Sequence, residues 1–183
     1  MLAVPGDDQL PVAAARAGDS AAWDTLFRRY QLPLYAYAFE LLRQEQTALD
    51  VVQETFINAS RHIASLREDA KFGSWLFGIA HQKCAQHWRK PRRTEPLDDG
   101  FLEQPDDEPW PGELLMRAEQ QEEFMTALNQ LPEIHRSVLL LHFLEDFPLD
   151  EIARITAVSV GTVKSRLHYA RKALRELITE KIP

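Results

Sequence analysis

Apolar residues recur at helical spacing along almost the whole chain. Leu26, Tyr30, Leu34 and Tyr37, for example, follow one another at steps of three and four. The chain has only seven glycines, and no stretch alternates apolar and polar residues over the length of a strand. In the first half this pattern predicts helices over residues 8–17, 20–43, 47–65 and 74–89. We expect Gly18 to end the first helix, Asp19 or Ser20 to cap the second and Ser74 to cap the fourth.

The second half repeats the helical pattern after a break. Helices are predicted over residues 113–128, 132–144, 148–155 and 160–178. The last two are separated only by residues 156–159, which is the spacing of a helix-turn-helix, and Ser159 stands where a cap belongs. The expected fold class is therefore all-α, with two small helical domains at 1–90 and 113–183 joined by a flexible acidic linker at 91–112.

The predicted linker also explains the charge of the chain. Residues 91–112 include five prolines and two glycines, which disfavour regular structure. Residues 94–113 hold eight acids and no Lys or Arg, so the net charge of −7 becomes +1 without them. The overall charge therefore does not argue against a nucleic-acid partner. The linker is interpreted as a solvated spacer; the alternative is that it imitates DNA by lying against a basic surface of its own chain.

The last predicted helix has one apolar and one basic face. Val163, Leu167, Ala170 and Leu174 form a narrow stripe that must be buried. From Val160 to Arg175 there are five Lys or Arg residues and no acid. Such side chains suit base edges and phosphates in a major groove, and a glycine near the helix start lets a phosphate approach closely. The alternative is an ordinary solvated basic face.

The motifs LDEIARI at 149–155 and VGTVKSRLHYARKAL at 160–174 resemble region 4 of bacterial sigma factors of the extracytoplasmic-function group. This chain differs from the usual pattern at Ala157, where glycine is common, at Tyr169, where arginine is common, and at Pro148. The resemblance implies recognition of the promoter −35 element. The implied −35 residues are Gly161, Thr162, Lys164, Ser165, Arg166, His168, Tyr169, Arg171 and Lys172.

The helix predicted at 47–65 also presents two faces. Its core stripe is expected to be Leu49, Val52, Phe56, Ala59 and Ile63. A second face carries Asp50, Glu54, Ile57 and Arg61. Two carboxylates beside an exposed isoleucine suit a partner that offers arginine and an apolar contact, although a solvated charged surface is the alternative.

Residues 48–59, ALDVVQETFINA, resemble the polymerase-binding helix of sigma region 2. In that family the partner is the coiled-coil clamp of the largest polymerase subunit. The resemblance implies that core RNA polymerase is bound by Asp50, Gln53, Glu54 and Ile57.

Residues 72–90 resemble sigma regions 2.3 and 2.4, which read the −10 element. The implied −10 residues are His81, Gln82, Lys83, Gln86, Arg89 and Lys90. In the family, the loop before this helix, here residues 66–73, holds a base flipped out of the single strand. Gln82 stands where asparagine is frequent, so a different −10 preference is expected.

The resemblance predicts an alternative sigma factor whose partners are core RNA polymerase, promoter DNA and an anti-sigma factor. No signal peptide or membrane-spanning run is evident, so a cytoplasmic protein without membrane insertion is expected. No catalytic set and no cofactor are expected. Two rival hypotheses are a homodimeric helix-turn-helix repressor and a zinc enzyme using His81, Cys84 and His87.

Overall fold

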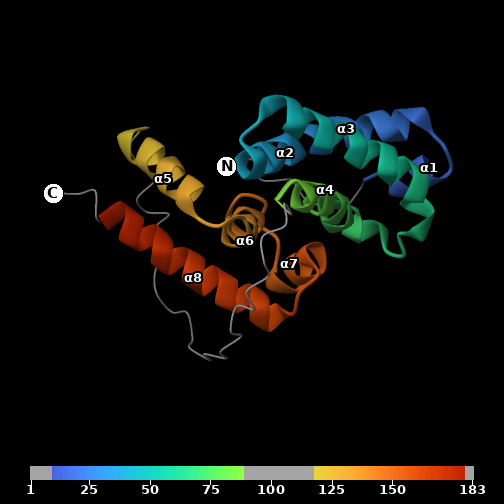
Figure 1. Cartoon of the computed structure of the whole chain (residues 1–183). Coiled ribbons are helices and arrows are strands. Elements are labelled where there is room, and N and C mark those ends of the chain that lie inside the picture. Colours follow the sequence, from blue (N-terminus) through green and yellow to red (C-terminus); the bar gives the residue numbers. More distant parts are fainter. Residues whose placement is uncertain (1–9, 89–117, 180–183) are drawn as a thin grey trace.

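The computed structural model describes residues 10–88 and 118–179, which are almost entirely helical (Figure 1). No strand occurs within these two ranges, so the all-α prediction is confirmed. The elements in chain order are α1 (Val12–Arg16), α2 (Ser20–Leu42), α3 (Glu45–His62), η1 (Ile63–Ser65), η2 (Asp69–Lys71), α4 (Phe72–Trp88), α5 (Ala118–Gln130), α6 (Glu133–Phe143), α7 (Leu149–Thr156) and α8 (Val160–Thr179).

The first unit, α1–α4, is built around buried aromatic side chains. Helices α2, α3 and α4 pack against one another, and α1 packs on α2. Tyr30 lies against Phe72, with ring centroids 5.6 Å apart, and Tyr37 lies against Phe77 at 5.5 Å. A Cβ at Gly73 would lie 3.0 Å from the Tyr30 hydroxyl, so the close approach of α4 to Tyr30 of α2 favours glycine at this position.

The second unit, α5–α8, is organised on α8. Helices α5, α6 and α7 all contact it. The four residues of the predicted apolar stripe, Val163, Leu167, Ala170 and Leu174, are each at most 4% exposed, which confirms the prediction for this helix.

Most of the predicted helix boundaries agree with the structure to within a few residues. Gly18 adopts φ of +91°, and the Asp19 carboxylate accepts a hydrogen bond of 2.8 Å from the N–H of Ala21. Ser159 Oγ accepts the N–H of Thr162 at 3.0 Å, as a helix cap should. The predicted linker, the start of the predicted helix at 113 and the −10 candidates Arg89 and Lys90 lie outside the described residues.

Two expectations about side chains are wrong. Ser74 does not cap α4, because the helix begins two residues earlier at Phe72; the Ser74 hydroxyl instead donates to the carbonyl of Lys71. Leu49 is not part of the core, since it is 46% exposed. Ala48 and Val51 take its place in the buried stripe of α3, which turns Leu49 toward the face that carries the acidic residues.

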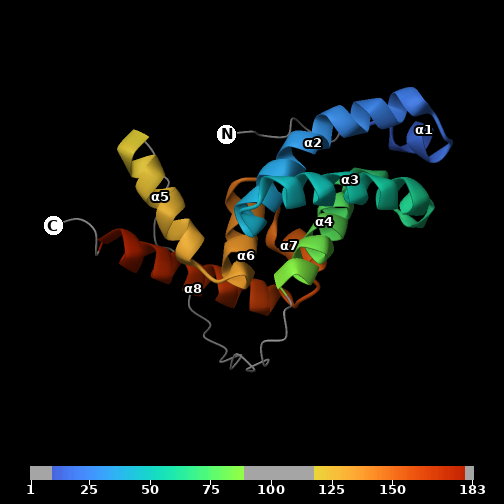
Figure 2. The same cartoon turned by 45° about the horizontal axis from the view of Figure 1, so that its top comes forward.

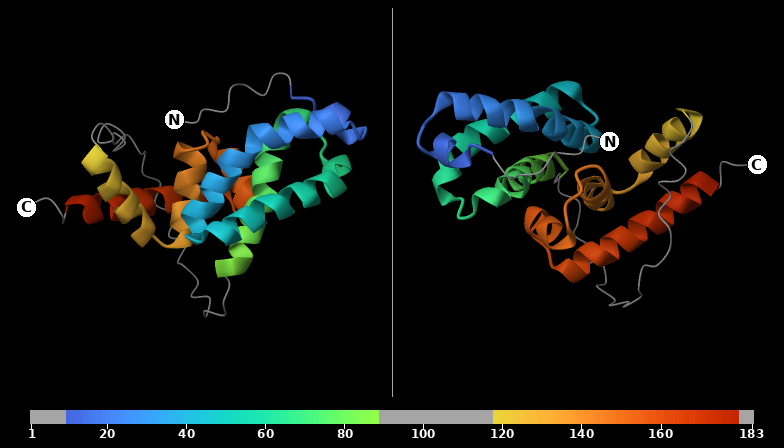
Figure 3. Two further views of the ribbon diagram at one scale, coloured as in Figure 1. Left: turned by 90° about the horizontal axis from the view of Figure 1, so that it is seen from above. Right: turned by 180° about the vertical axis from the view of Figure 1, so that it is seen from behind.

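The two units pack against each other. Helix α4 contacts α7, and α2 contacts α6, so α4 lies between α2 and α3 on one side and α7 on the other (Figures 1 and 2). Viewed from behind, α5 and α8 extend away from the first unit (Figure 3, right). Among the helices described, none has the length and apolarity needed to cross a bilayer.

Candidate DNA- and polymerase-binding surfaces

The predicted −35 residues share the outer side of α8. Lys164, Tyr169 and Lys172 are exposed, as is Gly161 in the first turn. The turn before α8 sets the direction of the helix. In this turn Ala157 adopts φ of +54°, and its N–H donates a hydrogen bond to the carbonyl of Arg154 in the last turn of α7. The borders of this exposed surface are formed by partly buried residues, namely Thr162, Ser165, Arg166, His168 and Arg171.

Helix α6 supports two of these side chains. The His135 ring stacks on Tyr169 with centroids 6.4 Å apart and planes 19° apart. Burial and the nearby Arg166 lower the pKa of His135, so its ring is neutral near pH 7. The Arg171 guanidinium lies over the ring of Phe143 at 5.2 Å. Tyr169 and Arg171 are therefore positioned by α6 as well as by α8.

No sequence motif indicates that His135 supports Tyr169. His135 lies 34 positions before Tyr169, outside the helix-turn-helix, and the two rings meet only through the fold. The local sequence pattern around the −35 residues therefore does not include His135.

The exposed side of α3 carries the predicted polymerase residues. Asp50, Gln53, Glu54 and Ile57 are all exposed, and Ile57 is 42% exposed. Leu49 joins them, because Leu49, Gln53 and Ile57 follow one another at steps of four on a single helix face. The Asp50 carboxylate is held along the helix by a hydrogen bond of 3.0 Å from the Gln46 amide. Two exposed apolar side chains, Leu49 and Ile57, therefore lie with the Gln53 amide beside the carboxylates, and Leu49 is a residue that the sequence pattern assigns to the core.

One predicted polymerase residue is bonded to one predicted −10 residue. Lys83 Nζ lies 2.6 Å from Glu54 Oε2, so the pair links α4 to α3. The Lys83 side chain is only 14% exposed, whereas that of Glu54 is 61% exposed. The hydrogen bond from Lys83 lowers the pKa of Glu54. In this conformation the Lys83 ammonium is directed to α3.

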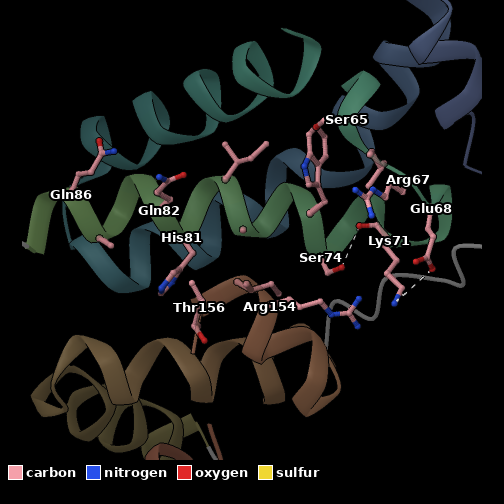
Figure 4. Close-up of a pocket in the computed structure, with 17 residues that line it drawn as sticks. Ser65, Arg67, Glu68, Lys71, Ser74, His81, Gln82, Gln86, Arg154 and Thr156 are labelled. Carbon is pink, nitrogen blue, oxygen red and sulfur yellow. Dashed lines mark hydrogen bonds and ion pairs between the residues drawn. The ribbon is translucent and has the colours of Figure 1, made fainter. Parts of the chain in front are cut away.

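Three other −10 candidates, His81, Gln82 and Gln86, line a groove of about 720 Å³ between α4, the 65–71 segment and α7 (Figure 4). Gln82 and Gln86 are exposed along it, and Trp75 and Ile79 form part of its wall. The end of α7 and the following turn, residues 156–157, form the opposite side. An amide both donates and accepts hydrogen bonds, and an indole offers a stacking surface, so the groove suits an unpaired base.

The His81 ring is positioned by contacts with Tyr37 and Trp88. Its Nδ1 lies 2.8 Å from the hydroxyl of Tyr37, and its ring meets Trp88 edge-on at 5.4 Å. Tyr37 is fully buried, and burial raises its pKa, so its hydroxyl stays neutral and remains available to this hydrogen bond. His81 therefore lies at the border between the core and the groove, on the side of α4 that faces α7 (Figure 4).

The segment before α4 is fixed by a residue that no sequence pattern singles out. Arg16, at the end of α1, forms an ion pair of 2.5 Å with Asp69 and donates to the carbonyl of Leu66 at 3.2 Å. These contacts hold the predicted base-capturing loop at two points. Arg16 is 53 positions from Asp69, so no local pattern connects them.

The three residues of the zinc hypothesis do not form a metal site. The thiol of Cys84 is buried in the core, and burial raises its pKa to about 12, whereas His87 is exposed. His81 already faces Tyr37. Within residues 10–88 and 118–179, no group of three His, Cys, Asp or Glu side chains is arranged to hold a metal ion.

Comparison with known proteins matches both units to one family. Sigma-70 region 2 matches residues 26–94, and Sigma-70 region 4 matches residues 121–174. The RNA polymerase sigma-H factor of Pseudomonas aeruginosa is 32% identical, over 98% of this chain and 100% of that protein. The ECF RNA polymerase sigma factor SigW of Bacillus subtilis is 28% identical, over 92% of this chain and 95% of that protein.

Solved structures show the same arrangement of helices. CnrH in complex with the cytosolic domain of CnrY has a TM-score of 0.70 at 24% identity, covering 96% of this chain and 99% of that one. RpoE of Bartonella quintana, in complex with the anti-sigma factor NepR, has a TM-score of 0.62 at 27% identity, covering 86% of this chain and 98% of that one. The chain belongs to the extracytoplasmic-function, or group 4, family of RNA polymerase sigma factors.

Proposed function

We propose that this chain performs the work of an alternative sigma factor through three surfaces: the exposed face of α3, the groove along α4 and the outer face of α8. Alternative sigma factors bind core RNA polymerase and direct promoter-specific initiation, and family membership assigns that function to the chain. The observation that carries the residue-level proposal is the exposed face of α3, where the Asp50 carboxylate, the Gln53 amide and the apolar side chain of Ile57 are all accessible.

The division of labour follows the two units. Residues 1–90 act as region 2, which binds polymerase and recognises and melts the −10 element. Residues 113–183 act as region 4, which reads the −35 element, and residues 91–112 connect them. The helical units at 10–88 and 118–179 support this division.

The polymerase surface is Asp50, Gln53, Glu54 and Ile57, extended by Leu49. Carboxylates that accept hydrogen bonds from arginine fix the orientation of the partner. The exposed apolar side chains become buried when the partner binds and so contribute to affinity. This combination suits a partner whose surface offers both cations and an apolar patch.

The −10 surface lies on α4 and the residues that follow it. Gln82 and Gln86 read base edges, while Lys83, Arg89 and Lys90 meet the backbone. His81 orients the edge of the groove through its hydrogen bond to the buried hydroxyl of α2.

On the −35 side, the first turns of α8 enter the major groove. Gly161 and Thr162 bring the helix start to a phosphate. The remaining residues divide by chemistry into cations that neutralise the backbone and side chains that reach base edges. The cations are Lys164, Arg166, Arg171 and Lys172, and the base-reading residues are Ser165, His168 and Tyr169.

The polymerase surface is tested by charge reversal. Asp50→Lys with Glu54→Lys should abolish transcription from a promoter library in the presence of core polymerase, because both carboxylates lie off the buried stripe and meet the partner directly. Loss of one partner of a desolvated charge pair costs about 2–5 kcal/mol. Asp24→Lys is the matched control, since Asp24 is an exposed acid on α2. Normal competition for core polymerase by the double variant would show that α3 is not the docking surface.

The −35 surface is tested by the dependence of binding on salt. Lys164→Ala and Lys172→Ala should each weaken binding of a −35 duplex at every sequence. The slope of log affinity against log salt should become shallower by about 0.9 for each phosphate that the variant no longer neutralises. Arg28→Ala, which removes an exposed cation on α2, should leave the slope unchanged. An unchanged slope in both lysine variants would mean that another face of α8 meets DNA.

The partners proposed for the chain also include an anti-sigma factor. RpoE of Bartonella quintana, which is 27% identical, forms a complex with the anti-sigma factor NepR, and this supports the same kind of control here. The chain is proposed to act in the cytoplasm and to have no catalytic activity of its own. Sigma factors are not enzymes, because the polymerase carries out RNA synthesis.

The homodimeric repressor is not favoured. A helix-turn-helix repressor accounts for α7 and α8 but gives no purpose to region 2, which matches residues 26–94. Co-purification of the chain with core polymerase distinguishes the two functions directly.

A further inference from the structure

The connection between α3 and α4 presents two side chains to the groove along α4. Arg67 and Glu68 lie within this connection, are exposed and line the groove (Figure 4). The residue before them, Leu66, is 9% exposed, and the residue after them, Asp69, is partly buried. The two exposed residues are therefore flanked on both sides by residues that contact the rest of the protein.

One guanidinium group holds both flanking residues. Nη2 of Arg16, at the end of α1, donates to the carbonyl of Leu66 at 3.2 Å and lies 2.5 Å from Oδ1 of Asp69. The Arg16 side chain is 32% exposed, so water reaches it only in part. The same nitrogen thus binds a main-chain atom on one side of Arg67 and Glu68 and a side chain on the other. A movement of Leu66 away from Asp69 breaks at least one of the two contacts.

Arg16 is itself placed by the packing of α1 on α2. Val12 and Ala15 are at most 2% exposed, and the indole N–H of Trp23 donates to the carbonyl of Ala15 at 3.0 Å. Gly18, with φ of +91°, then turns the chain from α1 into α2. The guanidinium therefore extends from a short helix that is fixed to the core of the first unit.

The segment that Arg16 holds is not helical. Leu66 follows η1 and Glu68 precedes η2, and both have extended backbones, with ψ of 118° and 114°. Ordering such a segment during binding costs conformational entropy, so a segment that is already held in place binds more tightly. A captured base must also be unstacked from its neighbours, which adds a further cost. The shape of this segment before binding therefore affects how readily a base is captured.

We propose that Arg16 is a positioning residue for base capture: it holds residues 66–69 in the shape that receives an unstacked base of the −10 strand, and α1 thereby takes part in promoter opening. The inference rests on the proposed function, because it takes the groove along α4 as the −10 surface. Arg16 contacts the segment and not the DNA. Its loss therefore weakens base capture and leaves docking on polymerase and recognition of the −35 element unchanged.

An abasic scan of the −10 strand tests this with the holoenzyme, formed from core RNA polymerase and the full chain. The probe is a promoter fork that is duplex through the −35 element and carries the −10 element as a single non-template strand. Each −10 nucleotide is replaced in turn by an abasic one, and the captured position is the one at which the parent loses most affinity. Arg16→Gln should bind the intact fork about 3- to 10-fold more weakly than the parent, which is the effect typical of a lost intramolecular hydrogen bond. On the fork that is abasic at the captured position, the two should bind equally.

The pattern of the scan distinguishes positioning from a general defect. Parental affinity of Arg16→Gln for the intact fork would overturn the inference, and so would a loss that is equal on every fork, including the one abasic at the captured position. Affinity for core polymerase and for a −35 duplex should match the parent, and a loss of either would also overturn it. A parent with no position sensitive to abasic replacement would instead count against the proposed function. Arg28→Gln is the matched control, because it removes an arginine that pairs with Asp24 on α2, and it should bind every fork as the parent does.

Replacement of Asp69 distinguishes positioning from a direct contact between Arg16 and DNA. If Arg16 met a phosphate, Asp69→Ala would bind the intact fork more tightly than the parent, because it removes a competing carboxylate. In the positioning role it should bind about 2- to 5-fold more weakly, because the segment loses one of its two contacts. The double variant Arg16→Gln with Asp69→Ala should be no weaker than Arg16→Gln alone, since both changes remove the same interaction. Tighter binding by Asp69→Ala, or additive losses in the double variant, would contradict the inference.

Discussion

At the scale of single residues, the bond between Lys83 and Glu54 joins two surfaces that the sequence assigns to different partners. Glu54, the acidic partner, is 61% exposed, and ion pairs that water reaches contribute only about 0–1 kcal/mol to stability, so this pair is not a major support of the fold. Its consequence is competition, because a polymerase arginine that takes Glu54 must displace the Lys83 ammonium. The displaced ammonium then becomes available to a DNA phosphate.

Replacement of Lys83 by methionine tests this competition. Glu54 would no longer have this internal partner to give up, so affinity for core polymerase should rise by about 1.5- to 5-fold, which corresponds to about 0.2–1 kcal/mol. Affinity for the −10 single strand should fall, since one cation is lost. Competition for labelled core polymerase measures the first effect. Arg28→Met, which removes the partner of Asp24, should change neither affinity. Weaker polymerase binding by Lys83→Met would exclude competition for Glu54.

Tyr169 is the residue at which promoter choice is expected to differ from that of relatives. It is 45% exposed on α8 and its ring is stacked on His135, so the ring is held in place on a surface that a base can reach. Tyr169→Arg, which restores the usual family residue, should introduce a preference for guanine at one position of the −35 element. A bidentate arginine contact discriminates by about 1–3 kcal/mol. Binding to −35 duplexes varied one base at a time measures this, and an unchanged preference would place Tyr169 outside the base-reading surface.

At the scale of the helices, the sequence predicts the elements well and their exposed faces less well. The stripe on α8 is correct because its four apolar positions allow only one buried side. On α3 the alternatives Ala48 and Leu49 are neighbours, and the larger residue is the wrong choice, since tight packing against α2 selects alanine. The start of α4 is misplaced because Ser74 has the chemistry of a cap, while the short helix η2 leads directly into α4 at Phe72.

The turn between α7 and α8 stores a small amount of strain. Ala157 has φ of +54°, a left-handed conformation that costs a residue with a Cβ about 1–2 kcal/mol and costs glycine little. Ala157→Gly should therefore raise the free energy of unfolding by about 0.5–1 kcal/mol, measured by urea denaturation. Ala36→Gly, the same change inside α2, should lower it by about 1 kcal/mol. A loss of stability in Ala157→Gly would show that its methyl group contributes more through packing than the backbone conformation costs.

At the scale of the whole molecule, the packing of the first unit against the second is the feature that the sequence does not predict. Its contacts join residues far apart in the chain: Arg136 meets Leu41 across 95 positions, and Phe147 on the second unit meets Phe77 on the first. An arginine in an apolar helix gives no indication of which carbonyl it will reach. Composition predicts a linker, and a linker leaves open whether the domains that it connects touch.

The last prediction is that the packing of the two units against each other, through α2 and α4 on one side and α6 and α7 on the other, weakens as pH rises. Glu145 lies between α6 and Phe147, and burial, assisted by the neighbouring Asp146, raises its pKa from 4.5 to about 7. Glu145 also raises the pKa of the buried Tyr37, so its carboxyl is within electrostatic range of the first unit. Because Glu145 interacts with Tyr37 of the first unit, we expect separation of the units to expose Glu145 and to return its pKa toward the ordinary value. Because the pKa is higher when the units are packed together, their packing is favoured while the carboxyl is protonated.

The packing of the units should therefore be unaffected by this group below about pH 4.5 and should lose stability between there and about pH 7, by at most about 3 kcal/mol. The radius of gyration of the free chain, measured at constant salt, should therefore increase between about pH 4.5 and about pH 7. Glu145→Gln keeps the side chain neutral, so the two units should remain packed and the radius of gyration should stay constant across this range. Asp146→Asn, which removes the neighbouring charge, should shift the transition only slightly toward lower pH. If Glu145→Gln opens with pH as the parent does, another group controls the packing of the units.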